Sequence, residues 1–360
     1  MISVVFCGDL RYCPYLDRYT ERLNEAQTEY EVLFWNRSSL KVDVPENYKF
    51  YGRPSAENLG KARKLADFWG FRRWVKKRLS VSRPDGIIFL STLSGVFLWD
   101  VAKRYRKKYI FDIRDYSYEH IAPFYRTEKT IIRDSFFTAI SSKGFLDFLP
   151  EYDYVIAHNF NRNDMTESFL FERQPKPYPI VWNGTVRYFD YQKKFLDVFK
   201  NDPRYLMVYH GTGAELDRYK EYCRENGITN VQFTGPYDNR DKRKLVRNAA
   251  FLNNCYGGSS VVNEVKYAVS NRFYDGLVYH IPQIVECGGY KGDETKRLGV
   301  GFCAEPTEDL PDRLWEYYRS FDARQFDKAC ECAIREILQE DDLYIQKIDD
   351  FIYYIEKREC

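Results

Sequence analysis

Residues 270–285 of this chain read Ser-Asn-Arg-Phe-Tyr-Asp-Gly-Leu-Val-Tyr-His-Ile-Pro-Gln-Ile-Val. The pattern predicts a helix that begins near Asn271 and Arg272 and carries Asp275 one turn later, followed by a strand that starts after a proline. A helix start with a cation favours an anion, and the carboxylate lies where the hydroxyls of a sugar can reach it. Taken alone, the stretch fits an ordinary helix-to-strand unit of an α/β domain equally well.

The same alternation of strands and helices runs along the whole chain. Strands are predicted at residues 3–7, 30–35, 86–90, 109–113, 136–140 and 154–157. After the proline-rich residues 174–179, further strands are predicted at 180–182, 205–210, 231–234, 251–255, 283–286 and 301–303. This alternation predicts an α/β fold of two doubly wound, Rossmann-like domains, 1–170 and 171–338. Residues 339–360 are predicted to form a helix with an apolar stripe that needs a surface to pack against.

The composition describes an ordinary globular protein of two domains, with 360 residues, 44% hydrophobic residues and a net charge of +2. No apolar run is long enough to cross a bilayer, and the first residues lack the basic start and cleavage site of a signal peptide, so we expect a cytoplasmic protein. The nine cysteines are scattered, and only four histidines accompany them. We therefore expect reduced core thiols and no metal site.

The two predicted domains differ in their glycine turns, and only the second has turns suited to bind a phosphate. The first strand is followed by the single glycine Gly8, whereas a dinucleotide-binding turn needs several. In the second domain, Gly211-Thr212-Gly213 joins a strand to a helix, where backbone N–H groups converge on an anion. Gly184 follows the strand at 180–182, and Arg187 can fork across two phosphate oxygens. The alternatives are a tight turn without a ligand and a solvated arginine at a helix start.

In their order, these elements resemble the donor-nucleotide half of GT-B glycosyltransferases, closely over residues 180–303 and loosely before them. The motifs are similar to the family's Gly-x-Gly-Pro-Glu turn, its Asn-Val-x-Phe-x-Gly strand (here residues 230–235) and its Pro-Asn-Lys-Leu-Tyr-Glu-Tyr helix (here residues 270–276). The nearest group looks like glycosyltransferase family 4 and bacterial capsule or surface-polysaccharide transferases. The resemblance implies a donor site made of Gly184, Arg187, Gly211, Thr212, Gly213, Pro236, Tyr237, Asn271, Arg272 and Asp275, with Pro236 and Tyr237 at the base and Asp275 at the ribose.

The resemblance also implies two domains that face each other across a cleft, with the C-terminal helix returning to the first. The implied activity is hexosyl transfer from a UDP- or GDP-sugar to a polyprenyl-diphosphate-linked or oligosaccharide acceptor. It needs no cofactor and no metal, because helix ends and arginines stabilise the diphosphate. Two departures keep other functions open. Tyr267 stands where many members carry an acid, with Glu264 out of register, and His280 replaces a glycine. A GT-B nucleotide-sugar epimerase and a catalytically silent GT-B subunit are the alternatives.

Acid and base groups are expected in the loop after the strand at residues 109–113. An inverting transferase needs a base for the acceptor hydroxyl, and Asp115 or His120 is the candidate. A retaining enzyme would use Arg187 and Arg272 to balance the departing phosphate. Alternatively, Asp112, Arg114 and Asp115 form a local set of salt bridges, and His120 is a plain loop histidine.

Residues 61–83 hold nine cations, one acid and several aromatic side chains. Helical spacing aligns Leu65, Phe68, Phe71 and Val75 on one side with cations beside them, which is typical of a helix on an anionic membrane surface. We predict that Arg72, Arg73, Trp74, Lys76 and Lys77 face the inner side of the cell membrane or the acceptor. Packing of the apolar side on the sheet is the alternative, and nothing extends the patch into a nucleic-acid groove.

Overall fold

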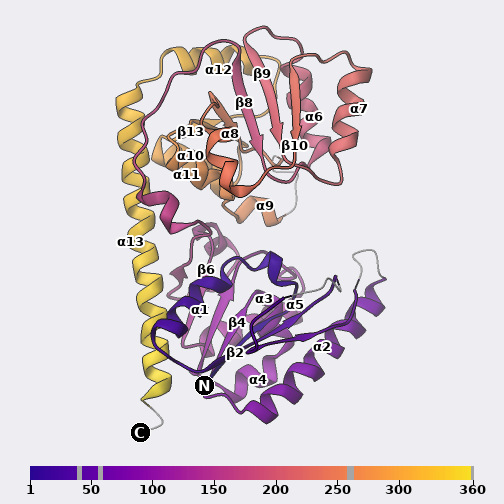
Figure 1. The fold of residues 1–360 in the computed structure, drawn as a ribbon, viewed down its shortest axis with the longest axis vertical. Helices are drawn as coiled ribbons and strands as arrows, with labels where there is room; N and C mark the ends of the chain where they lie inside the picture. The colour runs from indigo at the N-terminus through magenta and orange to yellow at the C-terminus, as the bar shows by residue number, and fades with distance from the viewer. Residues whose placement is uncertain (39–42, 56–59, 258–262, 358–360) are drawn as a thin grey trace. The chain divides into compact units, whose positions relative to one another are not determined.

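A computed structural model describes residues 1–38, 43–55, 60–257 and 263–357. The chain folds as two compact units, Met1–His158 with Gln339–Cys360, and Asn159–Leu338. Each unit is built on one sheet of parallel strands flanked by helices (Figure 1). The predicted α/β fold of two doubly wound domains is confirmed.

The first unit has the strand order β3-β2-β1-β4-β5-β6-β7. Its strands are β1 (Ile2–Phe6), β2 (Tyr30–Trp35), β3 (Tyr48–Tyr51), β4 (Gly86–Leu90), β5 (Tyr109–Ile113), β6 (Phe137–Ile140) and β7 (Val155–Ile156). Its helices are α1 (Leu16–Glu25), α2 (Lys61–Ser82), α3 (Thr92–Phe97), α4 (Trp99–Arg104) and α5 (Ala122–Asp134). The sequence analysis did not predict β3, an edge strand that pairs only with β2 and whose side chains are at most half-buried.

The second unit has the strand order β10-β9-β8-β11-β12-β13. Its strands are β8 (Tyr178–Asn183), β9 (Tyr205–His210), β10 (Val231–Gly235), β11 (Phe251–Asn253), β12 (Gln283–Val285) and β13 (Gly301–Cys303). Its helices are α6 (Phe189–Val198), α7 (Leu216–Glu225), α8 (Lys242–Val246), α9 (Asn263–Tyr267), α10 (Asn271–Val278), α11 (Tyr290–Leu298) and α12 (Leu310–Arg319). The sequence analysis set the domain boundary at residue 170, but Met165 and Phe169 are buried in the core of this unit, so it begins earlier in the chain.

The long helix α13 (Ala323–Glu356) ends the described chain. Its residues from Gln339 onward belong to the first unit. There Tyr344, Ile348 and Phe351 are fully buried in one core with β1, β2 and α1. Arg22 of α1 donates two hydrogen bonds, each of 2.8 Å, to the carboxylate of Asp349 on this helix. The apolar stripe predicted from the sequence thus buries its side chains in the first unit.

Candidate donor-nucleotide site

The carboxyl edge of the second sheet collects polar turns. Strand order reverses between β8 and β11, which end at Asn183 and Asn253. In open α/β sheets, ligands bind at such reversal points, beyond the carboxyl ends of the strands. This edge is therefore where a ligand site is expected in the second unit.

The turns after β8 and β9 lie in direct backbone contact. Gly184 and Gly211 have φ angles of 106° and 134°, in the region that favours glycine. A Cβ atom on Gly211 would stand 1.9 Å from the carbonyl oxygen of Gly184, and one on Gly213 would stand 2.2 Å from that of Val186. The Val186 N–H donates to the carbonyl of Thr212 over 3.0 Å. The four predicted turn residues, Gly184, Gly211, Thr212 and Gly213, therefore lie together.

Arg272 enters this region from the start of α10 and is 5% exposed. Its Nε donates to the carbonyl of Asn183 over 2.6 Å and its Nη1 to that of Asn253 over 3.2 Å. The guanidinium lies 3.4 Å from the ring centroid of Trp182, with Nη2 on the side of Gly184. Among the described residues no carboxylate forms a salt bridge with it. Burial lowers the pKa of Arg272, because the charged form loses hydration. A buried cation whose hydrogen bonds go only to carbonyl oxygens favours the approach of an anion.

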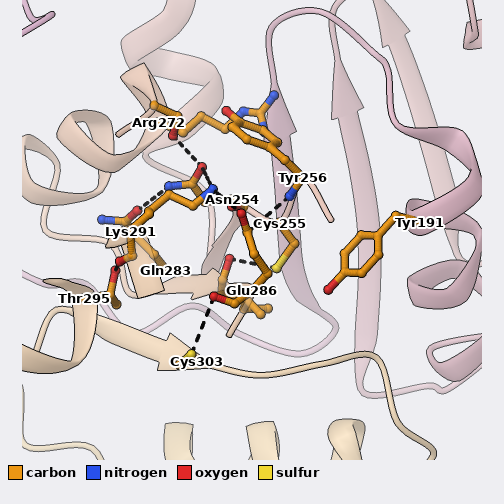
Figure 2. Close-up of polar contacts among 12 residues, drawn as sticks. Tyr191, Asn254, Cys255, Tyr256, Arg272, Gln283, Glu286, Lys291, Thr295 and Cys303 are labelled. Atoms are coloured by element: carbon orange, nitrogen blue, oxygen red, sulfur yellow. Dashed lines mark hydrogen bonds and ion pairs between the residues drawn. The ribbon is translucent and has the colours of Figure 1, made fainter. Parts of the chain in front are cut away.

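Two further cations, Arg187 and Lys291, lie with Arg272 around the ring of Tyr256. The Arg272 guanidinium lies 5.0 Å from its centroid, that of Arg187 lies 5.9 Å away, and the Lys291 ammonium lies 4.0 Å away. Arg187 is exposed and also lies over the Tyr188 ring, at 4.8 Å. Figure 2 shows the Arg272 side chain beside Tyr256. The predicted pair of arginines is thus arranged around one aromatic ring.

Lys291 and Glu286 form a buried ion pair of 3.1 Å, drawn in Figure 2. Glu286 Oε2 also accepts a hydrogen bond from the Tyr256 N–H over 3.2 Å, and Lys291 donates to the carbonyl of Asn254 over 2.6 Å. Glu286 therefore balances Lys291 and leaves the charge of Arg272 without a carboxylate partner. Neither residue was predicted from the sequence, although Glu286 stands at the end of a predicted strand.

Asp275, the predicted ribose ligand, is buried and already oriented. Its Oδ1 accepts from Lys242 Nζ over 2.7 Å and its Oδ2 from Asn183 Nδ2 over 2.9 Å. Lys242 begins α8, after the loop of Pro236 and Tyr237. Burial and the charge of Asp275 raise the pKa of Tyr237, which places that predicted base-site residue near the carboxylate. Each carboxylate oxygen thus accepts one of these hydrogen bonds, and a carboxylate oxygen has two lone pairs. Lys242 was not predicted.

Other predicted donor residues lie at the surface of the second unit. Thr212, Pro236 and Asn271 are exposed, and the Asn271 side-chain oxygen accepts a hydrogen bond from Asn159 over 3.0 Å. Their side chains are accessible to a ligand from solvent.

His280 and Tyr267, the two residues that depart from the GT-B motif, differ in their surroundings. His280 has a φ of 52°, in the region that favours glycine, and its Nδ1 lies 2.6 Å from Asp327 Oδ1. That contact pairs the buried His280 ring with the partly exposed carboxylate of Asp327. Tyr267 ends the short helix α9 and offers no carboxylate, and the side chain of Glu264 lies outside the described residues.

In the first unit, the predicted acid and base candidates are exposed. Asp115 and His120 follow β5, and the His120 ring stacks on Tyr116 with centroids 6.4 Å apart. Asp112 and Arg114 form a buried bidentate pair, with N–O distances of 2.6 and 2.7 Å. The local salt-bridge interpretation therefore holds for these two residues, and Arg114 is committed to the core.

Two buried carboxyl groups follow β5: Glu119 lies in the loop of Asp115 and His120, and Glu128 lies on α5. Glu119 Oε2 accepts a hydrogen bond of 2.5 Å from the Ser117 N–H, whereas Glu119 Oε1 and both oxygens of Glu128 have no hydrogen-bond partner among the described residues. Burial, and then the charge of Glu119, raises the pKa of Glu128 to about 9. Burial likewise raises the pKa of Glu119. Glu128 is therefore protonated at neutral pH, and sequence analysis did not identify it.

The apolar side of α2 packs into the first unit. Phe68, Phe71 and Val75 are buried, with Phe71 stacked on Trp35 at 5.7 Å and Phe68 on Phe97 at 4.6 Å. Packing on the sheet, the alternative interpretation, is thus confirmed for Phe68, Phe71 and Val75, which cannot face a membrane, whereas Leu65 is exposed. The aromatic side chains of α2 pack into the first unit because this burial removes apolar area from water that a membrane-facing side would leave exposed in the free protein.

The predicted cations of α2 divide into two groups. Arg72 and Lys76 pair with Asp100, at 2.8 and 2.6 Å, so they are not free for lipid, and Trp74 packs against Tyr51 and Phe71. Arg73 and Lys77 are exposed. They lie in a row spaced by four residues that we call the outer α2 stripe: Leu65, Trp69, Arg73, Lys77 and Val81.

No family model matches the sequence, and no curated protein matches it. Solved structures do match the fold. A sucrose-phosphate synthase from Thermosynechococcus elongatus has a TM-score of 0.67 at 13% identity, over 96% of this chain and 98% of that one. The lipopolysaccharide outer core galactosyltransferase WaaB gives 0.64 at 16% identity, over 98% and 99%. Anabaena HepE in complex with UDP gives 0.65 at 12% identity, over 99% and 100%.

These structures confirm the predicted GT-B fold. The fold alone does not fix the reaction, because a UDP-GlcNAc 2-epimerase from Methanocaldococcus jannaschii also matches, with a TM-score of 0.56 at 11% identity over 94% of this chain and 100% of that one.

A first prediction concerns the contact between the two glycine turns. We expect Gly211→Ala to destabilise the second unit by about 3 kcal/mol or more, because its Cβ would overlap the Gly184 carbonyl and its φ is unfavourable. Gly227→Ala is the matched control, since that glycine has a φ of 60° and open space around it, and it should cost about 1 kcal/mol. Urea unfolding measures both. Equal effects of the two substitutions would contradict the contact.

A second prediction concerns pH. The pKa of Glu128 is raised in the folded state, so folding binds a proton there, and stability is lost as pH rises from the unfolded pKa toward about 9. We expect Glu128→Gln to remove this loss, which has a slope of up to about 1.4 kcal/mol per pH unit. Urea unfolding between pH 5 and pH 9 measures it, with the exposed Glu221→Gln as the control. A wild-type slope that persists in Glu128→Gln would disprove the assignment.

Proposed function

We propose that the protein is a metal-independent glycosyltransferase that moves a hexose from a nucleotide-diphospho-sugar to a lipid-linked or oligosaccharide acceptor in bacterial surface-polysaccharide synthesis. The observation that carries the proposal is Arg272, a buried guanidinium at the carboxyl edge of the second sheet with no carboxylate partner among the described residues. A diphosphate supplies the missing negative charge. Support comes from HepE, which was solved with UDP and with UDP-glucose.

The donor would be held by three kinds of contact. Arg272 Nη2 and the exposed Arg187 would bind the diphosphate, and the backbone of the Gly184 and Gly211 turns allows close approach of its oxygens. Asp275 would accept hydrogen bonds from the ribose hydroxyls, and Lys242 would balance the charge of the Asp275 carboxylate. With two arginines present at the leaving group, the protein itself provides the positive charge that departure of the nucleotide requires.

The acceptor would bind to the first unit. Asp115 and His120 are exposed on the loop after β5 and are the candidates for the base that takes the acceptor hydroxyl proton. WaaB, which acts on the lipopolysaccharide outer core, supports a glycolipid or oligosaccharide acceptor. Buried Glu119 fixes the loop through the Ser117 N–H, so both candidates start from an ordered backbone.

A nucleotide-sugar epimerase is the second candidate, favoured by the match to a UDP-GlcNAc 2-epimerase. It requires acid and base groups but no acceptor. A catalytically silent subunit is favoured by Tyr267, which leaves that position without a carboxylate.

A turnover assay separates the three functions. We expect purified protein to release UDP or GDP from one nucleotide-hexose of a panel only when a lipid-linked glycan acceptor is added. Turnover to an isomeric sugar without acceptor would instead indicate the epimerase. Donor binding without any turnover over the whole panel, with several acceptors, would indicate the silent subunit.

We predict that Arg187→Gln weakens UDP binding about tenfold, because one charge-assisted contact to the diphosphate, worth about 1.5 kcal/mol, is lost. Uridine affinity should not change, since uridine has no phosphate. Isothermal titration with UDP and uridine measures both, and Arg313→Gln on α12 is the control for an exposed arginine of the same unit. A similar loss for uridine, or none for UDP, would refute the diphosphate role.

We further propose that the outer α2 stripe binds an anionic membrane surface. None of the described helices has the length and apolar character of a membrane span. The stripe instead offers Trp69 and Val81, 48% and 74% exposed, to the lipid interface, and Arg73 and Lys77 to its headgroups.

The double variant Arg73→Gln/Lys77→Gln should bind phosphatidylglycerol vesicles about 30-fold more weakly at low salt, at about 1 kcal/mol per cation. Co-sedimentation measures the partition. Lys220→Gln/Arg224→Gln removes two exposed cations from α7 and should bind as the wild type does. Undiminished binding of the α2 variant, or equal wild-type binding to phosphatidylcholine vesicles, would rule out the surface.

A further inference from the structure

The described cysteines fall into three classes of exposure. Five are buried, and burial raises the pKa of each thiol: Cys7, Cys13, Cys223, Cys255 and Cys330. Such thiols are sealed from oxidants in solution. Cys287 and Cys303 are half-exposed, and Cys332 is fully exposed. Only the half-exposed pair brings two thiols together among the described residues.

Neighbouring strands place Cys287 and Cys303 side by side. Cys303 ends β13 and lies opposite Val285 in the parallel register with β12. Cys287 follows β12 by two residues, and its Sγ lies 2.8 Å from that of Cys303. The Cys303 Sγ also lies 3.6 Å from the carbonyl oxygen of Glu286. A disulfide bond joins sulfurs at about 2.05 Å, so a small approach of the two side chains would close it.

We propose that Cys287 and Cys303 are a dithiol site for reversible oxidation to a disulfide by a low-molecular-weight disulfide such as oxidised glutathione. The Cys287 sulfur, as thiolate, attacks one sulfur of oxidised glutathione, which forms a mixed disulfide and releases one glutathione. Cys303 then loses its proton and attacks the Cys287 sulfur, which closes the bridge and releases the second glutathione. Two protein thiols are oxidised and one glutathione disulfide is reduced to two thiols.

The order of attack follows from the surroundings of the two thiols. Burial, and then the adjacent Cys287 thiol, raises the pKa of Cys303 to about 12. Cys303 therefore keeps its proton while both thiols are free. In the mixed disulfide the Cys287 thiol no longer contributes, and Lys296, which lowers the Cys303 pKa, favours the second attack.

The bridge would lock the loop that carries the buried ion pair of the donor site. Glu286 precedes Cys287, and α11, with Lys291 in its first turn, lies between the two cysteines. Because the sulfurs already touch, closure should leave the Glu286 and Lys291 contacts in place. We therefore expect a higher melting temperature of the oxidised protein and a UDP affinity within about twofold of the reduced form.

Peptide mapping of the full chain tests the site directly. The protein is equilibrated with graded ratios of oxidised to reduced glutathione, free thiols are blocked, and trypsin is added. Because cleavage follows Arg272, Lys291, Arg297 and Arg313, the bridge would join peptides 273–291 and 298–313, each with one cysteine. We expect this linked pair, its loss on treatment with dithiothreitol, and a melting temperature several degrees higher when it is present.

Three variants make the test specific. Cys287→Ser and Cys303→Ser should each abolish the linked peptides and the thermal shift, and Cys332→Ser should change neither. Glutathione found on Cys287 or Cys303 without the linked pair, or thiols that stay reduced at every ratio that modifies Cys332, would overturn the proposal. A linked pair without the thermal shift would overturn the locking of the loop.

Discussion

The guanidinium of Arg272 is held between the ends of β8 and β11 by two backbone carbonyls and the face of Trp182. A cation removed from water in this way costs several kcal/mol unless negative charge approaches it. Glu286 pairs with Lys291 and Asp275 pairs with Lys242; the Asp275 charge also acts on Arg272, but no carboxylate among the described residues forms a salt bridge with it. Among the described residues Arg272 thus has no salt-bridge partner at the reversal point of the sheet, and the proposed diphosphate site rests on this observation.

The two glycine turns lie beside that charge. Gly211 and Gly184 touch backbone to backbone, and Arg272 Nη2 lies on the side of Gly184, while the Arg272 side chain itself is buried. Around the same point, Tyr256 has cations on several sides, and Lys242 orients Asp275. Positive charge for a diphosphate and a carboxylate for hydroxyl groups thus lie on neighbouring elements, the combination that a nucleotide-sugar requires.

Much of the fold was predictable because buried parallel strands are short, apolar and separated by helices. Strands 205–210 and 301–303 were predicted with the observed bounds. The edge strand β3 was not, since its half-exposed side chains show no such run. The two aromatic sides of α2 could not be ranked from spacing alone: Phe68 and Phe71 pack on Trp35 and Phe97, contacts made by residues distant in the sequence.

The lack of information on contacts between distant residues also explains which site residues could be predicted from the sequence. Arg272, Asp275 and the glycines stand in local motifs and were predicted as members of one donor site. Lys242, Glu286 and Lys291 stand in no local motif. Lys242 meets Asp275 only when the sheet brings separate segments together, whereas Glu286 and Lys291 pair across the short connection from β12 to α11. The burial of Glu128 could not be predicted from the sequence either, since a glutamate on a helix is usually solvated.

The crystal structure of the protein with UDP is the most direct test of the unbalanced charge. We expect a phosphate oxygen within hydrogen-bond distance of Arg272 Nη2, the diphosphate against the Gly184 turn, and the ribose hydroxyls at Asp275. UDP bound elsewhere, or an Arg272 side chain turned to a carboxylate of the protein while UDP is bound, would contradict the central claim.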